Sequence, residues 1–435
     1  MGALVGVQIL NYILPIITIP VIVRIIGPSK FGLINYASSI VAYFILFISF
    51  SFELSASRYI AMNQDNHEKI NQIFSRVFFT KICLFFFSAL IFILLLSGFE
   101  TLQKDKLIAI YTFLICIGTV FDCNYFYAAK QDLKQTALFN LVTKVIMNLS
   151  LLYFIRKQDD YLYQPLIISL TQIFVGFFAF LWAIRRYKLR IAFPGLNSIW
   201  RIIWSDKTLF FHSFAHTVYT TFNIIMLGFF RGTIEVGYYT AGWKLIILIQ
   251  ALLISPLGMV LFPIIGQAFG KSNEEGLKIV QKFLPVILFS TFIIAIGILI
   301  LGGPFILIFY GSKFHDSILI FKLLSFMPMM LALNMLFGIQ TMVNLKMDKK
   351  FFAITLAASF FNILLNLLLI NRIGSVGAAI SWFLTETFCT VVMYIVLTKN
   401  HVTLFNYEYF NFSGLKSSMA PVIEKFKDRF KKPNL

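Results

Sequence analysis

Residues 11–37 read NYILPIITIPVIVRIIGPSKFGLINYA, and this stretch decides the fold class. An apolar run reaches Arg24, breaks at Gly27-Pro28, shows a single lysine and becomes apolar again from Phe31. A hydrophobic helix of about 20 residues crosses the roughly 30 Å hydrocarbon layer of a bilayer. The pattern therefore predicts two membrane-spanning helices joined by a short turn.

The rest of the chain continues this pattern. Of its 435 residues 59% are hydrophobic and 13% are charged, which is more apolar surface than one water-soluble core can bury. We predict an all-α polytopic membrane protein, because the apolar stretches are too long for barrel strands. Twelve spans are expected at 4–26, 35–56, 77–98, 107–127, 137–155, 164–184, 208–230, 238–262, 283–309, 317–341, 351–371 and 376–398.

The formal net charge of +18 does not indicate a nucleic-acid partner, because the lysines and arginines follow the topology. Most lie in the loops after even-numbered spans and in the C-terminal tail, which is the positive-inside pattern. Both termini are therefore expected in the cytoplasm. The basic clusters should lie near anionic membrane lipids. No cleavable signal peptide is expected, since the first span has neither a basic segment before it nor a small-residue cleavage site.

Motifs of familiar enzyme chemistry are missing from the sequence. There is no Walker A motif, nucleophile elbow or HExxH, so neither ATP-driven transport nor a known hydrolytic centre is indicated, and no cofactor is predicted. The four cysteines stand singly in apolar spans and are interpreted as small core residues. His212 and His216 have the i,i+4 spacing of metal ligands, but no third ligand accompanies them, so a polar lining or packed core is favoured.

The longest cytoplasmic connection divides the spans six and six. We predict an N-lobe at 1–184, a linker at 185–207, a C-lobe at 208–398 and a basic tail at 399–435, with the two lobes related by pseudo-twofold symmetry around a central cavity. Amphipathic surface helices are expected in the linker and the tail. Their apolar stripes are Leu196, Ile199, Trp200 and Ile203, and Leu415, Met419, Val422, Phe426 and Phe430.

The opening motif recurs. RGTIEVGYYTAGWK at 231–244 and RIGSVGAAISW at 372–382 also place an arginine at a helix end, then a glycine-containing turn and a re-entering helix. By this comparison Gly32 and Gly237 occupy equivalent positions in the two lobes. The alternative is a set of unrelated tight turns, since glycine turns between spans are common.

Polar residues follow one helical face in several spans. Polar groups in hydrocarbon are costly unless they face other helices or water, so these faces indicate either a lumen or interhelical hydrogen bonding. The faces are Gln8, Asn11 and Thr18; Asn140, Lys144 and Asn148; His212, His216, Thr220 and Asn223; and Thr355, Ser359, Asn362 and Asn366.

Charges inside the spans narrow the choice of substrate. Lys144 and Lys244 lie within spans, whereas Lys322 and Arg24 are near enough to an end to snorkel. Fixed cations suit an anionic substrate such as a lipid phosphate. Acidic residues near or within the spans are Glu53, Asp122 and Glu386. Each of them either neutralises a lysine or, for Asp122 and Glu386, takes up the proton or sodium ion that drives transport.

The stretch at 11–37 and FELSASRYIA at 52–61 resemble the bacterial O-antigen and capsule repeat-unit flippases, the polysaccharide-transporter family of the multidrug/oligosaccharidyl-lipid/polysaccharide exporter superfamily. VGYYTAGWKL at 236–245 and YGSKF at 310–314 are similar to that family as well.

The resemblance implies a bacterial inner-membrane protein that moves an undecaprenyl-diphosphate-linked oligosaccharide from the cytoplasmic to the periplasmic leaflet by alternating access, without covalent chemistry and so not as an enzyme. It implies that Arg24, Arg58 and Lys244 are cations that line the substrate path or belong to a gate. Further substrate candidates follow from the helical face that a residue occupies and its position along the predicted span. They are Lys144, Lys322, Asn11 and His216. Polysaccharide polymerase and chain-length proteins are expected partners.

Two alternatives stay open at this point. A membrane-embedded polysaccharide polymerase or ligase also has about a dozen spans, but such enzymes usually have a large periplasmic loop that this chain lacks. A multidrug/cation antiporter of the same superfamily would favour a cavity dominated by carboxylates, and the lysines within the spans argue against it.

Overall fold

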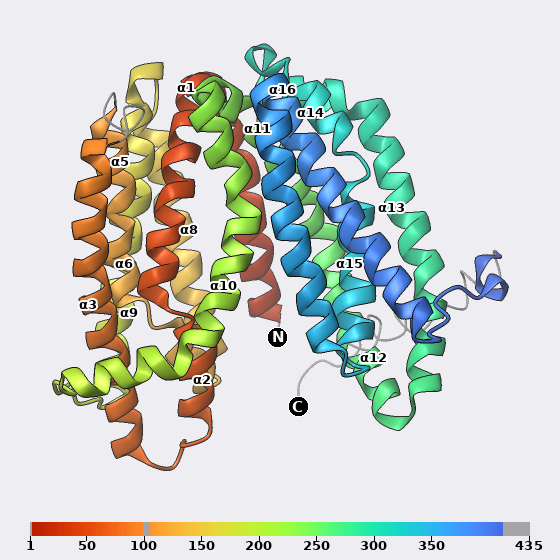
Figure 1. The fold of residues 1–435 in the computed structure, drawn as a ribbon. Coiled ribbons are helices and arrows are strands. Elements are labelled where there is room, and N and C mark those ends of the chain that lie inside the picture. Colours follow the sequence, from red (N-terminus) through yellow and green to blue (C-terminus); the bar gives the residue numbers. More distant parts are fainter. Residues whose placement is uncertain (1, 99–104, 412–435) are drawn as a thin grey trace. The chain divides into compact units, whose positions relative to one another are not determined.

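The computed structural model describes residues 2–98 and 105–411, and these are helical with no strand. They form two compact units, residues 1–237 and 238–435 (Figure 1). The elements of unit 1 are α1 Gly2–Ser49, α2 Phe52–Ala61, α3 His67–Gly98, α5 Lys106–Phe113, α6 Ile115–Phe121, α7 Asn124–Ala129, α8 Leu133–Phe154, η1 Gln158–Leu162, α9 Tyr163–Tyr187 and α10 Leu196–Arg231.

Unit 2 begins within α11, Thr233–Ile249. The remaining elements are η2 Gln250–Ile254, α12 Ser255–Lys271, α13 Asn273–Tyr310, η3 Ser312–Phe314, α14 Ser317–Leu323, α15 Met327–Asn334, η4 Met335–Met342, α16 Asp348–Lys399 and η5 Tyr407–Phe410. The core of the unit joins α12, α13, α15, η4 and α16 through buried side chains such as Leu261, Phe283 and Leu336.

The fold class is confirmed: the described residues contain eight helices, or nine if a bent pair counts as one span, that are long and apolar enough to cross a membrane. Two of the helices, α1 with 48 residues and α16 with 52, contain a non-helical break near their middle. Each is about twice the length that one crossing needs. The number of twelve spans stays a prediction, and so does the division into six and six.

All three arginine-glycine turns have a glycine with positive φ. Gly27 breaks α1 at φ 76°, Gly232 follows α10 at φ 85°, and Gly374 breaks α16 at φ 57°. Residues other than glycine are strained at these positive φ values. The chain can therefore reverse at each turn within very few residues.

Gly32 and Gly237 face each other. A Cβ atom built on Gly32 would overlap the carbonyl oxygen of Thr233, and one built on Gly237 would overlap the carbonyl oxygen of Pro28. The close approach of the two backbones is thus reciprocal within unit 1. Gly32 and Gly237, which the sequence motif predicts to be equivalent positions, therefore lie against each other in the structure.

The linker helix expected at 196–203 is the first part of α10, which continues to Arg231. In Figure 1 this first part, drawn in lime green, lies across the end of the unit before the helix turns to run along it. Its predicted stripe divides: Ile199 is buried, while Leu196 and Trp200 are exposed. The stripe expected in the tail, from Leu415 to Phe430, lies outside the described residues.

One cysteine differs from the expectation of core packing. Cys116, Cys123 and Cys389 are buried, but Cys83 is exposed on α3. An apolar side chain facing lipid carries no cost in a membrane protein, so a small hydrophobic residue in a span need not lie in the protein core.

Candidate functional site

Two helix breaks lie together inside unit 1. The first separates α1 from α2 at Phe50 and Ser51, whose φ values are 43° and 61°. The second separates α6 from α7 at Asp122 and Cys123. Helix ends leave backbone groups without helical partners, and hydrocarbon offers them none. Because α2 packs against α7, polar side chains can gather where these breaks occur.

Lys81 of α3 supplies the positive charge at the second break. Its side chain is only 4% exposed. The ammonium donates hydrogen bonds to the carbonyl oxygens of Thr119 at 3.2 Å and Asp122 at 2.7 Å, and lies 5.4 Å from the centre of the Tyr125 ring. A cation is favourable at a helix C-terminus. Lys81 therefore caps α6 at the point where this span breaks.

Two carboxylates lie in the neighbourhood of this lysine, Asp122 at the break itself and Glu53, which is exposed on α2. Both Glu53 and Asp122 interact electrostatically with it. Asp122 Oδ1 also accepts a hydrogen bond from the backbone N–H of Asn124 at 3.0 Å, at the start of α7. Two acids near one buried cation form a cluster in which a gain or loss of one proton alters the charge balance. The cluster can therefore stabilise the two helix breaks or couple them to an ion.

Glu386 is the centre of a polar network in unit 2. The side chain is 5% exposed on α16. One carboxylate oxygen accepts from Asn334 Nδ2 at 2.6 Å and the other from Trp382 Nε1 at 3.2 Å. Thr390 donates to the Asn334 side-chain oxygen at 2.8 Å. The helices α15 and α16 are thus joined by a buried carboxylate that accepts from neutral donors.

One residue of the polar face at 355–366 bonds to the other half of α16, while Thr355 and Ser359 bond to backbone carbonyls of their own half. Asn362 Nδ2 donates to Thr385 Oγ1 at 3.1 Å, and Asn366 Nδ2 donates to Asn362 Oδ1 at 2.9 Å. The first bond connects the two halves of α16 across the break at Gly374, whereas the second lies within the first half. Interhelical bonding therefore accounts for Asn362.

The cations predicted from sequence in unit 1 do not gather. Arg24 is exposed one turn before the break at Gly27, and Arg58 is exposed on α2 beyond the other end of the same span. The part of α1 between the breaks, residues 28–49, is about 33 Å long at 1.5 Å per residue. No diphosphate group can touch both arginines at once. Lys144 is half-buried on α8.

The remaining candidates lie in unit 2 or outside the described side chains. Lys244 on α11 and Lys322 on α14 are both half-buried. The backbone places Asn11 on α1 and His216 on α10, but their side chains lie outside those that the structure describes. The substrate roles of all these residues stay predictions.

Sequence reasoning overlooked Lys81. Its signal was available, because a single lysine stands between Phe79 and Leu84 in the apolar span expected at 77–98. What the sequence did not show is where the ammonium goes, since Thr119 and Asp122 lie in another span. Only the packing of α3 against α6 identifies this lysine as a helix cap.

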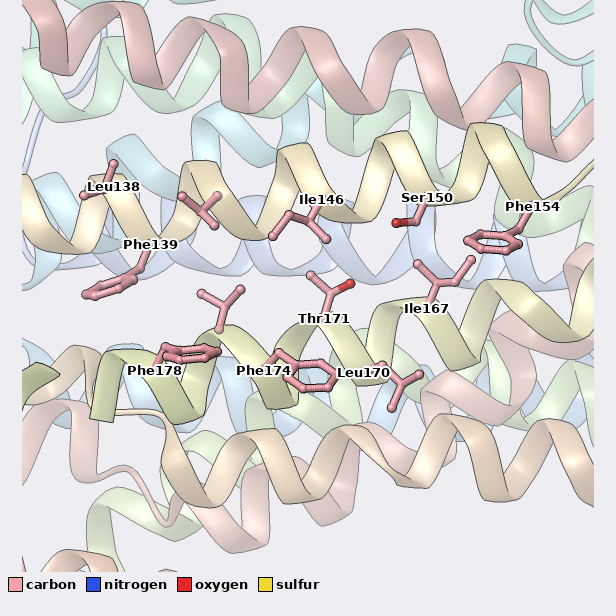
Figure 2. A pocket seen from close by; sticks show the side chains of 12 residues that line it. Leu138, Phe139, Ile146, Ser150, Phe154, Ile167, Leu170, Thr171, Phe174 and Phe178 are labelled. Carbon is pink, nitrogen blue, oxygen red and sulfur yellow. The ribbon is translucent and has the colours of Figure 1, made fainter. Parts of the chain in front are cut away.

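An apolar groove of about 580 Å³ follows the junction of α8 and α9. Figure 2 shows the side chains of the two helices facing each other along it, with hydroxyl groups only at Ser150 and Thr171. Lys144 is two positions from both Val142 and Ile146, which line the groove, so it belongs to the other side of α8. The groove suits a hydrocarbon chain and offers no partner for a charged group.

Comparison with known proteins identifies the family. The sequence model described as polysaccharide biosynthesis protein matches residues 1–269. The chain belongs to this family. A relative from Escherichia coli (strain K12) named "Putative O-antigen transporter" is 25% identical over 397 residues, covering 91% of this chain and 95% of the relative. A relative of the same name from Shigella dysenteriae is 24% identical, covering 88% and 95%.

Solved structures share the fold. The lipid II flippase MurJ in an inward closed conformation matches with a TM-score of 0.73 at 15% identity, covering 100% of this chain and 94% of MurJ. A multidrug-resistance transporter of the MATE family in the MOP superfamily matches with a TM-score of 0.72 at 12% identity, covering 89% and 94%. At these identities the likeness concerns the fold alone.

Proposed function

We propose that this family member is a flippase of the bacterial inner membrane, which moves an undecaprenyl-diphosphate-linked oligosaccharide repeat unit from the cytoplasmic to the periplasmic leaflet by alternating access. The observation that carries the proposal is the match of the polysaccharide biosynthesis family, extended over almost the whole chain by the relatives named as O-antigen transporters. The movement requires no covalent chemistry, which agrees with the absence of enzyme motifs from the sequence.

The distribution of charge supports an anionic substrate. The candidate cations Arg24, Arg58 and Lys144 lie on different segments of unit 1, and we propose that they attract the diphosphate at different stages of its movement. Electrostatic attraction of this kind lowers the cost of taking a phosphate through a low-dielectric region. We assign the termini to the cytoplasm, so that Arg58 is the cation on the cytoplasmic side and Arg24 the one on the periplasmic side.

We further propose that an ion drives the cycle and that Glu386 takes it up. This carboxylate is buried and bonds to Asn334 of α15 and Trp382 of α16, so uptake of a proton or sodium ion there would act directly on the packing of these helices. Asp122 is the second candidate, although its carboxylate also stabilises the start of α7.

The deciding experiment reconstitutes the purified protein in vesicles with a fluorescent undecaprenyl-diphosphate oligosaccharide and measures how much of it an external reagent can reach over time. We expect translocation that an imposed proton or sodium gradient accelerates. A lipid-linked sugar without the diphosphate is the matched control. If no gradient produces movement of the diphosphate lipid, the proposal fails, and lengthening of the glycan by the purified protein would instead indicate a polymerase.

A further inference from the structure

A basic pocket lies at the end of unit 1 where the first part of α10 crosses the bundle (Figure 1). Its volume is about 410 Å³. Three elements that are far apart in the sequence contribute to it: the end of α2, the first turns of α3 and the first part of α10. The lining residues are Tyr59, Lys69, Gln72, Ile73, Arg76, Arg201, Ile202 and Ser205.

The lining carries three cations and no acid. Lys69, Arg76 and Arg201 form no ion pair within 4.0 Å among the residues that the structure describes. The adjacent carboxylates bond to neutral neighbours: Asp206 accepts from Ser205 at 2.8 Å, and Glu68 from Gln72 at 3.5 Å. Like charges held together repel, so this arrangement favours an anion between them.

One donor of a side chain that lines the pocket has no hydrogen-bond partner. Arg76 Nε is buried, and no acceptor reaches it. A buried donor without an acceptor is costly and rare in folded proteins. A guanidinium keeps its charge at any physiological pH and matches the oxygens of a phosphate. Arg76 therefore brings to the pocket a guanidinium that no carboxylate neutralises, and a phosphate is a matching ligand for it.

The surroundings place the pocket at the membrane surface. On the same part of α10, Trp200 and Trp204 are 64% and 60% exposed, and their rings stack at 6.3 Å. Lys207 lies 3.5 Å from the centre of the Trp204 ring. Exposed tryptophans beside basic residues are typical of helices at the headgroup level of a bilayer. Arg201 thus reaches the pocket from a helix that lies among lipid headgroups.

We propose that this pocket binds the phosphate of an anionic membrane lipid on the cytoplasmic side, with Arg76 and Arg201 as the phosphate ligands and Lys69 at the rim. The first part of α10 lies in the membrane surface with the lipid held under it. This site goes beyond the proposed flippase function and does not depend on it, because a resident lipid can anchor α10 whatever substrate is moved.

The test is native mass spectrometry of the full-length protein titrated with phosphatidylglycerol, phosphatidylcholine or inorganic pyrophosphate. The variants are Arg201→Gln, Lys69→Gln and the double variant Arg76→Gln/Arg201→Gln. We expect the double variant to bind phosphatidylglycerol about 10-fold or more weakly, since removing one charge-assisted hydrogen bond to a phosphate weakens binding by roughly that factor. Arg185→Gln is the matched control, because Arg185 is an exposed arginine outside the pocket.

Two results would overturn the proposal. Unchanged phosphatidylglycerol binding in the Arg201→Gln and Lys69→Gln variants removes the site, and both side chains are exposed enough to be replaced without disturbing the core. Binding of pyrophosphate with no preference for phosphatidylglycerol over phosphatidylcholine would identify a soluble phosphate as the ligand instead of a lipid. Translocation activity is not part of either readout, so the proposed function is judged separately.

Discussion

Lys81 shows how a single charge can serve the backbone inside an apolar span. Its ammonium donates to the carbonyl oxygens of Thr119 and Asp122 at the break between α6 and α7, where the Thr119 oxygen otherwise accepts only a 3.3 Å bond from the Asp122 backbone N–H among the backbone bonds of this turn. An ammonium has three donors and no acceptor, so a helix C-terminus is a suitable partner. The burial of Lys81 thus has a local structural cause, whatever role its interaction with Glu53 and Asp122 has in transport.

Replacing Lys81 with methionine should lower stability. The methionine side chain has similar length but removes the ammonium donor from the Asp122 carbonyl oxygen, at a cost of about 1–3 kcal/mol for a buried group, while the Thr119 oxygen keeps its 3.3 Å bond from the Asp122 backbone N–H. Thermal unfolding of the detergent-solubilised protein measures the change. Lys134→Met serves as control, because Lys134 is exposed near the start of α8. Equal unfolding temperatures for both variants would mean that Lys81 does not cap α6.

Glu386→Gln should separate ion coupling from folding. Glutamine keeps the size of the side chain, but its amide group has one oxygen for the two donors Asn334 and Trp382, and it cannot take up a proton or sodium ion. We expect the variant to reach the membrane and to lose the acceleration of translocation by an ion gradient. Asp348→Asn, an exposed acid at the start of α16, is the control. A fully gradient-responsive Glu386→Gln variant would exclude this carboxylate as the coupling site.

Three glycines shape the turn between the first two predicted spans and its packing. One of them allows the chain to reverse, and the other two allow two segments to approach closely. Gly27 permits the reversal, since its φ of 76° is strained for other side chains. Gly32 and Gly237 permit the close approach of α1 and α11, because each Cα is packed on a backbone carbonyl of the other segment. At the level of elements, the arginine-glycine motif thus encodes both a turn and the contact on which that turn packs.

Alanine at Gly32 or at Gly237 should destabilise unit 1. A Cβ at either position overlaps a backbone atom, which cannot rotate away, so we expect a loss of about 1–3 kcal/mol or more from overpacking. Gly297→Ala on α13 is the matched control, since a Cβ there meets nothing within 4 Å. The control should be neutral or slightly stabilising because alanine favours helix. Loss of melting temperature by Gly297→Ala but not by Gly32→Ala would contradict the contact.

The whole molecule shows which properties the sequence could predict. Hydropathy and the charge pattern sufficed for the helical membrane fold, because in a bilayer every span must satisfy its own backbone hydrogen bonds. The motifs at 11–37 and 52–61 sufficed for the family, which the comparison confirms. Sites made by distant segments were not predictable. Lys69 and Arg201 share a pocket only because α10 crosses the end of α3.

The topology can be tested with single cysteines. Lys134→Cys should react with a membrane-impermeant maleimide only from the cytoplasm, and His315→Cys only from the periplasm, because their loops follow even and odd spans. Both native side chains are exposed. The native protein is the labelling control, since Cys83 is exposed but lies within a predicted span. Labelling of both positions from the same side would refute the predicted span order.

Charge removal tests the transport path as a whole. Arg24→Ala and Lys244→Ala should reduce assembly of the surface polysaccharide in cells while leaving membrane insertion intact, since each removes a fixed cation expected to attract the diphosphate. Lys349→Ala, an exposed cation at the start of α16, is the control. Polysaccharide levels and membrane-protein levels are measured together. Full export by both variants would assign Arg24 and Lys244 to structure alone.

The contact between Gly32 and Gly237 also affects the order in which the protein can fold during its synthesis. The two positions are contributed by segments on either side of the middle of the chain, so the first spans have no partner surface at 233–237 when they enter the membrane. At 5–20 residues per second, a ribosome needs about 10–40 s to bridge that distance. During this interval the face at Gly32 is without the segment that packs on it. The packing of the first turn is therefore complete only after residues 233–237 have been synthesised.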